Sequence, residues 1–265
     1  MYSLRLTCKP EDVDFLSAEL WEAGTIGIRE LNDEEQIVLV AGFETNEERA
    51  ELIRRFCGYA PEWYAEDAVD WEGVSRSAWP EREVGEQLFL VPPWSVAPTP
   101  SGRKRIIVNP GLACGTGGHP CTQLALIALD KVVAPECRVV DVGTGSGILA
   151  IAALRLGASR VVGVDVDEAA LHATRENLRL NGMQANLICG SAEALATGCA
   201  DVTVANISAT VLLNIWDELL RVSRCPACLI LTGFPESEAD VFMRSLPGAE
   251  VGQMEGWCCV KAGIT

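Results

Sequence analysis

The chain has 265 residues, of which 49 % are hydrophobic and 22 % are charged, and its formal net charge at pH 7 is −16. This length allows one large domain, or a large domain with a small partner, and the apolar content is enough for a core. The acidic balance disfavours direct binding to a nucleic-acid backbone, and no run approaches the roughly 20 apolar residues that a membrane helix needs.

Residues 1–68 show the order strand, helix, strand, strand, helix, strand. The first helix has a single apolar face and ends at Gly24, and Thr45 with Glu48 forms a capping box for the second helix. This order is typical of a small ferredoxin-like α+β domain, which is usually a docking or regulatory module. The expected strands include residues 2–7, 26–31 and 36–43.

Residues 69–105 differ from their surroundings in composition. They contain Trp71, Trp79 and Trp94, together with five prolines. Flexible spacers rarely contain three tryptophans, so we expect an ordered connector between two domains.

Residues 106–265 alternate short β-rich runs with helical runs. This alternation predicts an α/β domain with a parallel sheet and helices in the gaps. The expected parallel strands are residues 138–142, 160–165, 186–189, 201–205 and 228–232.

The first of these strands runs through a glycine turn into a helix, in the sequence VVDVGTGSGILA. Gly143, Gly145 and Gly147 permit a tight turn and a close approach of a ligand to the backbone. Asp165 ends the next strand, where a carboxylate can accept hydrogen bonds from both hydroxyls of a ribose. Ile148 departs from the dinucleotide pattern, and no P-loop lysine follows a glycine turn, so a nucleoside without pyrophosphate fits best.

The fourth strand delivers Asn206 to the same edge of the sheet, because parallel strands present their carboxyl ends on one side. An uncharged amide at that place can accept a hydrogen bond from an amine. The alternative is that Asn206 only caps the next helix.

The segment GLACGTGGHPCT, residues 111–122, precedes an apolar helix-like run. Pro120 suits the first helical position, so residues 119–122 form a helix N-terminus that can attract an anion. The alternative is a plain helix-entry loop. We expect His119 to order this loop through a hydrogen bond and assign it no catalytic role.

The eleven cysteines have no regular framework spacing, so we expect reduced thiols in a cytoplasmic protein. Cys225 and Cys228 form one C-x-x-C pair with no second pair or histidine at zinc-ligand spacing. We therefore expect no metal.

The D-V-G-T-G-S-G turn, Asp165 and the helix ending E-N-L-R-L-N-G resemble class I S-adenosylmethionine-dependent methyltransferases. More narrowly, the whole chain is similar to the bacterial ribosomal protein L11 methyltransferase family. The motifs that carry this narrower resemblance are Asp70-Trp71, Val84-Gly-Glu-Gln-Leu, Pro93-Trp94, Pro110-Gly-Leu-Ala, Gly115-Thr-Gly, His119-Pro, Thr122 and Ala205-Asn-Ile207.

The resemblance implies a Rossmann-like class I methyltransferase domain over residues 106–265, behind an N-terminal ferredoxin-like domain that recognises a ribosomal protein. It implies S-adenosyl-L-methionine as cofactor, and lysine or N-terminal amino groups of the large-subunit protein L11 as methyl acceptors. Within this fold we expect Asn206 to be catalytic, by aiming the acceptor amine. The expected cofactor-binding residues are Thr122, Gly143, Gly145, Asp165 and Asn206.

Two other functions stay open. The chain could methylate another protein or a small amine, or it could be a non-catalytic nucleoside-binding module that docks a basic partner. The intact glycine turn, Asp165 and Asn206 favour catalysis, and the extra N-terminal domain favours a protein substrate. We expect a monomer that binds neither nucleic acid nor membrane directly.

The sequence departs from the family pattern at three places. Cys114 stands where the family usually has phenylalanine, and Cys121 where it has threonine, so we expect an altered lining on the substrate side. After the third strand, Ser191 or Glu193 takes the place of the acidic residue that meets adenine in related enzymes.

Overall fold

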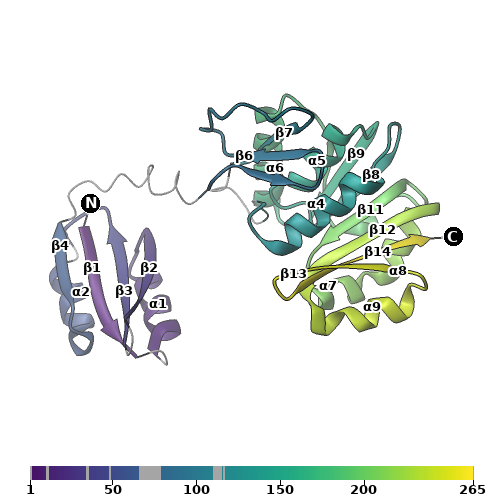
Figure 1. The fold of residues 1–265 in the computed structure, drawn as a ribbon. Coiled ribbons are helices and arrows are strands. Elements are labelled where there is room, and N and C mark those ends of the chain that lie inside the picture. The colour runs from purple at the N-terminus through teal and green to yellow at the C-terminus, as the bar shows by residue number, and fades with distance from the viewer. Residues whose placement is uncertain are drawn as a thin grey trace. The chain divides into compact units, whose positions relative to one another are not determined.

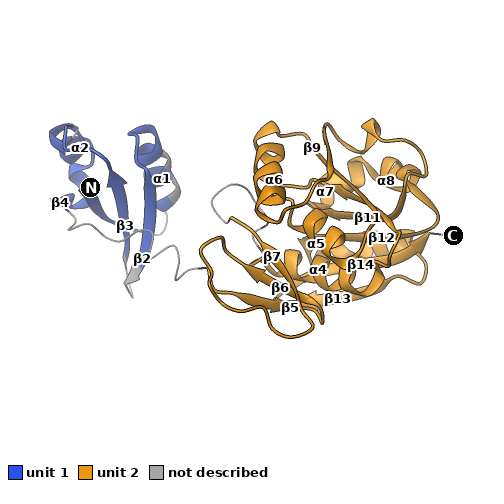
Figure 2. Ribbon diagram, turned by 90° about the horizontal axis from the view of Figure 1, so that it is seen from above, with its two compact units in different colours: residues 1–74 blue, residues 75–265 orange. Residues whose placement is uncertain are grey.

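The computed structural model describes residues 2–9, 12–33, 36–47, 49–65, 79–109, 115 and 117–264. The chain divides into two compact units, residues 1–74 and 75–265, which are coloured separately in Figure 2. None of the helices in the described ranges is long and apolar enough to cross a membrane.

The first unit is a four-stranded antiparallel sheet with two helices (Figure 1). Its sheet order is β2-β3-β1-β4, and the three neighbouring pairs are all antiparallel. This is the split βαβ topology that the sequence pattern predicts. Its elements are β1 (Tyr2–Cys8), α1 (Val13–Glu22), β2 (Gly27–Asp33), β3 (Gln36–Phe43), α2 (Arg49–Arg55), η2 (Cys57–Tyr59) and β4 (Glu62–Ala65).

The first unit has its own apolar core, because alternate strand residues and one face of each helix point inward. Leu4 and Leu6 of β1 pack with Leu16 and Leu20 of α1, and all four are fully buried. The predicted capping box of α2 involves Glu48, which lies outside the described residues.

The second unit, residues 75–265, includes part of the segment 69–105 that the sequence analysis described as a connector. The strands β5 (Arg82–Val84), β6 (Leu88–Val91) and β7 (Lys104–Ile107) form a separate three-stranded sheet. Its buried residues Leu88, Leu90 and Ile106 belong to the core of the second unit, so this segment is part of the domain. Residues 69–78 of the expected connector lie outside the described residues.

The short turn between β5 and β6 is fastened to α4 (Pro120–Val132) by one carboxylate. Asp130 Oδ2 accepts hydrogen bonds from the backbone N–H groups of Glu86 at 2.6 Å and Gln87 at 3.1 Å. Gly85 has a φ of 58°, and a Cβ there would lie 2.5 Å from Asp130 Oδ2. These contacts explain the sequence V-G-E-Q-L at this turn.

The main sheet of the second unit has seven strands in the order β10-β9-β8-β11-β12-β14-β13. The five expected parallel strands are all present, as β8 (Arg138–Val142), β9 (Arg160–Asp165), β10 (Asn186–Cys189), β11 (Ala200–Asn206) and β12 (Ser223–Pro235). The sequence analysis did not assign β13 (Glu250–Met254) and β14 (Trp257–Ile264), and β14 runs antiparallel to both β12 and β13.

Helices cover both faces of this sheet, because both faces of its central strands are apolar. In β8, Val139 points to the layer of α4, α5 and α6, whereas Val140 points to the layer of α7, α8 and α9. Figure 1 shows these two layers around the strands. The remaining bounds are α5 (Ile148–Leu156), α6 (Glu168–Leu180), η3 (Ala192–Ala194), α7 (Ala209–Asn214), α8 (Trp216–Val222), η4 (Glu236–Glu238) and α9 (Ala239–Ser245).

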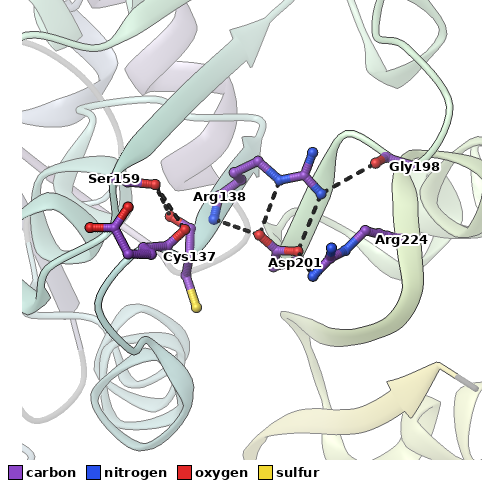
Figure 3. Close-up of polar contacts among 7 residues, drawn as sticks. Cys137, Arg138, Ser159, Gly198, Asp201 and Arg224 are labelled. Atoms are coloured by element: carbon purple, nitrogen blue, oxygen red, sulfur yellow. Dashed lines mark hydrogen bonds and ion pairs between the residues drawn. The ribbon is translucent and has the colours of Figure 1, made fainter.

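At the amino edge of the sheet, Asp201 joins β11 to β8 and β12 (Figure 3). Its carboxylate accepts hydrogen bonds from the backbone N–H of Arg138 at 2.9 Å and from the Arg138 guanidinium at 3.1 Å and 3.2 Å. Arg224 forms a second ion pair with the same carboxylate. These hydrogen bonds with the arginine lower the pKa of Asp201.

Candidate functional site

A cavity of about 510 Å³ lies at the carboxyl edge of the main sheet. Gly143 and Gly145 from the turn after β8, Asp165 at the end of β9 and Asn206 at the end of β11 all line it. The structure therefore brings together four of the five residues that the sequence analysis selected. The fifth, Thr122, contacts one of these four.

The glycine turn has a backbone conformation that side chains other than glycine rarely adopt. The φ angles of Gly143, Gly145 and Gly147 are 73°, 55° and 79°. A Cβ on Gly143 would lie 2.5 Å from Ile207 Cγ2, and a Cβ on Gly147 would lie 2.7 Å from Thr174 Cγ2. The turn therefore needs these glycines for its own packing as well as for an open cavity.

Asp165 is held in place by two backbone donors. Its Oδ2 accepts from the N–H of Gly145 at 2.9 Å, and its Oδ1 accepts from the N–H of Asp167 at 3.1 Å. A carboxylate has about four lone-pair sites, so each oxygen keeps acceptor capacity for a ligand hydroxyl. Asp167 itself caps α6 by accepting from the N–H of Ala169 at 2.8 Å.

Asn206 and Thr122 meet although they are far apart in the sequence. The Asn206 Nδ2 donates a hydrogen bond of 3.2 Å to Thr122 Oγ1. Because the amide nitrogen faces Thr122, the Oδ1 of Asn206 remains the acceptor end of this side chain. Thr122 is 2 % exposed, so this contact fixes the orientation of an amide that lines the cavity.

The N-terminus of α4 begins at Pro120 and is capped by His119, as the sequence predicts. His119 Nδ1 accepts from the N–H of Cys121 at 3.2 Å, and its ring lies edge-on to Trp257 at 4.6 Å. His119 thus orders the loop. Pro120 has no N–H, and the N–H of Cys121 donates to His119. The N–H of Thr122 in the first turn donates no hydrogen bond within the described residues, so it can donate to a ligand.

Cys121 is not among the residues that line this cavity. Its side chain is 2 % exposed. Burial raises the pKa of its thiol, and a hydrogen bond with Thr232 offsets part of this rise. Cys258 is also buried, and its Sγ donates to the carbonyl of Phe234 at 3.8 Å. Cys114 lies outside the described residues.

Asp141 is a buried carboxyl group that the sequence analysis missed. Its Oδ2 accepts from Thr144 Oγ1 at 2.8 Å and from the N–H of Ala150 at 3.1 Å, while its Oδ1 is buried and has no hydrogen-bond partner among the described residues. Burial raises the pKa of Asp141 to about 7. Its signal in the sequence is the acidic residue two positions before the first glycine of the turn.

The remaining wall of the cavity is mostly apolar. Val166, Val211 and Ile215 line it, and Val166 is 75 % exposed although it is aliphatic. Ser191 also lines the cavity, whereas Glu193 is not among the lining residues. Of the two residues expected to replace an acidic adenine partner, Ser191 is therefore the one at the cavity.

Within the described ranges, no group of three or more His, Cys, Asp or Glu side chains is arranged so that it could hold a metal ion. Cys225 and Cys228 lie within β12, and both thiols are free.

The family model described as "Ribosomal protein L11 methyltransferase (PrmA)" matches residues 2–264. A ribosomal protein L11 methyltransferase of Ectopseudomonas mendocina is 34 % identical over 268 residues, covering 93 % of this chain and 91 % of the relative. One of Symbiobacterium thermophilum is 35 % identical over 205 residues, covering 76 % of this chain and 67 % of the relative.

Among solved structures, a ribosomal protein L11 methylase from Lactobacillus delbrueckii subsp. bulgaricus superposes with a TM-score of 0.64. It is 30 % identical and covers 68 % of this chain and 96 % of that one. A 16S rRNA methyltransferase of T. thermophilus, solved with AdoMet and guanosine, has a TM-score of 0.52. At 18 % identity, with 99 % of this chain and 65 % of that one covered, it shows a shared fold.

Proposed function

The chain belongs to the ribosomal protein L11 methyltransferase (PrmA) family, and on this premise we propose that it methylates lysine and N-terminal amino groups of ribosomal protein L11. The methyl donor is S-adenosyl-L-methionine. The observation that carries this proposal is the single cavity shared by the glycine turn, Asp165 and Asn206, in a chain that matches the family from residue 2 to residue 264.

The cavity fits a nucleoside cofactor. Its volume of about 510 Å³ lies within the range of roughly 300–1,000 Å³ that small-molecule sites have. Asp165 would hold the ribose through its two oxygens, and Gly143 and Gly145 would let the rest of the cofactor lie against the backbone. The aliphatic Val166 and Val211 would pack against the adenine, with Ser191 as the polar group nearby.

The N-terminus of α4 would hold the amino-acid end of the cofactor. Thr122 offers its N–H at the positive end of the helix dipole, which favours a carboxylate. Thr122 is the donor that remains there, because the neighbouring N–H of Cys121 already donates to His119.

The cofactor supplies an activated methyl group and its own leaving group, so the protein's role is alignment. The Oδ1 of Asn206 would accept a hydrogen bond from the incoming amine and aim its lone pair at the methyl carbon. In the structure Thr122 accepts from Nδ2, which leaves Oδ1 as the end of this amide that can receive the amine. A lysine has a pKa of about 10.4 in water and must lose its proton before it can react.

The first unit supports a protein substrate in preference to a small amine. Among the described residues of this unit, five large hydrophobic side chains are exposed, although the unit has a core of its own. Exposed apolar side chains are typical of protein-binding surfaces. These five are Phe15, Trp21, Ile26, Leu31 and Tyr64.

We further propose that the protein is a monomer that acts in the cytoplasm. Ten free cysteines in the described residues fit a reducing compartment. A non-catalytic docking module would have no use for the orientation of Asn206 by Thr122, so this contact favours catalysis over that alternative.

A labelling experiment tests the proposal. The protein is incubated with methyl-labelled cofactor and a bacterial lysate that lacks this activity, and labelled proteins are identified by mass spectrometry. We expect label on lysine and N-terminal amines of ribosomal protein L11. Label on other proteins alone would overturn the substrate, and no label with intact cofactor binding would favour the docking module.

A further inference from the structure

One face of α6, continued by its C-cap residue, carries three polar side chains that are shielded from water. Thr174 and Asn177 are fully buried, and Asn181 is 7 % exposed. Their spacing of three and four residues places them in a row on one side of the helix. Burying a polar group without a hydrogen-bond partner costs free energy, so we expect each side chain of this row to have partners.

The row binds the cofactor turn. Thr174 Oγ1 donates to the carbonyl of Gly145 at 2.8 Å, and Asn177 Nδ2 donates to the carbonyl of Ser146 at 2.8 Å. These two hydrogen bonds fix two successive peptide groups of the turn that lines the cavity.

The row also binds the end of β7. Asn177 Oδ1 accepts from the N–H of Asn109 at 2.9 Å. Asn181 pairs with both backbone groups of Ile107, donating to its carbonyl at 2.7 Å and accepting from its N–H at 2.9 Å. The segment that leads toward the G-T-G-x-H-P motif is therefore fastened to the helix that also holds the cofactor turn.

Ser146 extends this connection to the other side of the motif. It is fully buried, and its Oγ donates a short hydrogen bond of 2.6 Å to the carbonyl of Gly115. Gly117 packs closely against Leu90, because a Cβ at this position would lie 2.5 Å from Leu90 Cδ1. The same segment then enters α4 and reaches Thr122, which orients Asn206.

We propose that Ser146, supported by Asn177, is a positioning residue for methyl transfer. It fixes the distance between the glycine turn and Gly115, next to the stretch 117–122 that leads into α4, and thereby aligns the Asn206–Thr122 pair with the cofactor. Affinity for the cofactor depends mainly on Asp165, so the loss of Ser146 slows turnover much more than it weakens cofactor binding. This inference rests on the proposed function.

The test compares Ser146→Ala with the control Ser223→Ala. Ser223 is also buried and its Oγ donates to a backbone carbonyl, that of Leu219 at 2.8 Å, but it lies in β12 outside the cavity. For Ser146→Ala we expect kcat to fall by at least about tenfold, since a misplacement of about 1 Å can cost about a hundredfold. The Kd for S-adenosylhomocysteine, measured by calorimetry, should rise by a clearly smaller factor than kcat falls, because Asp165 still holds the ribose and only the Thr122 contact with the amino-acid end is loosened.

For Ser223→Ala we expect a similar loss of thermal stability with both constants unchanged. Equal kinetic losses in the two variants, or an unchanged kcat in Ser146→Ala, would overturn the proposal.

Hydrogen exchange gives a second measurement that does not depend on the methyl acceptor. In the unmodified protein, S-adenosylhomocysteine should slow the exchange of amides in peptides covering residues 115–121 as well as 141–149. In Ser146→Ala the protection should remain at 141–149 and disappear at 115–121. Protection confined to 141–149 in the unmodified protein would reject the positioning role, even if ribosomal protein L11 proved to be the wrong substrate.

Discussion

Asn206 provides the sharpest test of the chemistry at the level of a single residue. The change Asn206→Ala removes the acceptor Oδ1 and leaves Thr122 Oγ1 without its donor. We expect kcat to fall by about a hundredfold, because alignment of the amine is the protein's main contribution to the transfer. Steady-state kinetics at saturating cofactor measure this effect. A rise in the KM for the cofactor with an unchanged kcat would contradict the alignment role.

Asp165→Asn tests the ribose contact. The substitution keeps the volume but replaces one acceptor with a donor, which then faces the N–H of Gly145 or Asp167. We expect the Kd for S-adenosylhomocysteine to rise by at least about a hundredfold, since hydrogen bonds to a charged group contribute about 1.5–3 kcal/mol each. Calorimetry measures the change. Unaltered binding in a folded variant would place the nucleoside elsewhere.

Asp141 makes stability depend on pH. Burial raises its pKa in the folded state to about 7, so its protonated form is favoured by folding. Its contribution to the free energy of unfolding is complete below the unfolded pKa and is lost as the pH rises through about 7. Over that window the unmodified protein should lose up to about 1.4 kcal/mol per pH unit relative to Asp141→Asn, which has no charge to bury. Urea unfolding of both proteins across this range measures it, and parallel curves would contradict it.

At the scale of elements, Asp201 joins three strands at the amino edge of the sheet (Figure 3). We expect Asp201→Asn to lower the free energy of unfolding by about 1–2 kcal/mol at neutral pH, a reduced value because both arginines are partly exposed. The pKa of Asp201 is lowered, so this stability is present above its unfolded pKa and is lost as the pH falls through the folded pKa.

Glu250→Gln is the matched control for Asp201→Asn. It breaks the 2.9 Å pair with Lys261, in which the carboxylate is 74 % exposed, and should lower the free energy of unfolding by less than Asp201→Asn does, because solvent screens an exposed pair. Urea unfolding at neutral and acidic pH measures both variants. A cost of Asp201→Asn that does not shrink in acid would show that the charge is not its source.

The sequence predicts an element well where the element's own pattern decides it. The parallel strands are apolar runs such as R-V-V-D-V and R-V-V-G-V-D, because they are buried on both faces. β13 has the sequence E-V-G-Q-M and is largely exposed, so its composition does not predict a strand. It is a strand because it pairs with β14. β5, β6 and β7 were missed for a similar reason, since their short lengths gave too little periodicity.

The same distinction holds for the site. The glycine turn and Asp165 follow from local sequence, because strand ends and glycine turns have signatures of their own. The contact between Asn206 and Thr122 joins residues 84 positions apart, and the burial of Cys121 depends on β12 packing against α4. Contacts of this kind depend on tertiary packing, so Thr122 and Cys121 could be selected only through a family resemblance.

At the scale of the whole molecule, the proposed function assigns cofactor binding to the second unit and recognition of the protein substrate to the first. Each unit has its own core, so a chain that begins at Ser75 should fold and bind S-adenosylhomocysteine with a Kd within about threefold of the full chain. Its kcat/KM on ribosomal protein L11 should fall by at least about a hundredfold, because the exposed apolar surface of the first unit is lost. Retention of full activity would show that the catalytic unit recognises the protein alone.

The net charge of −16 affects how the enzyme meets its substrate. An acidic enzyme and a lysine-bearing partner attract each other before contact, and salt screens this attraction over a Debye length of about 10 Å at 0.1 M. We therefore expect kcat/KM on the protein substrate to fall by about tenfold between about 0.05 and 0.3 M sodium chloride. The kcat should stay constant, since methyl transfer within the bound complex does not depend on encounter. A kcat/KM that is independent of salt would mean that the acidic surface serves solubility and has no part in recognition.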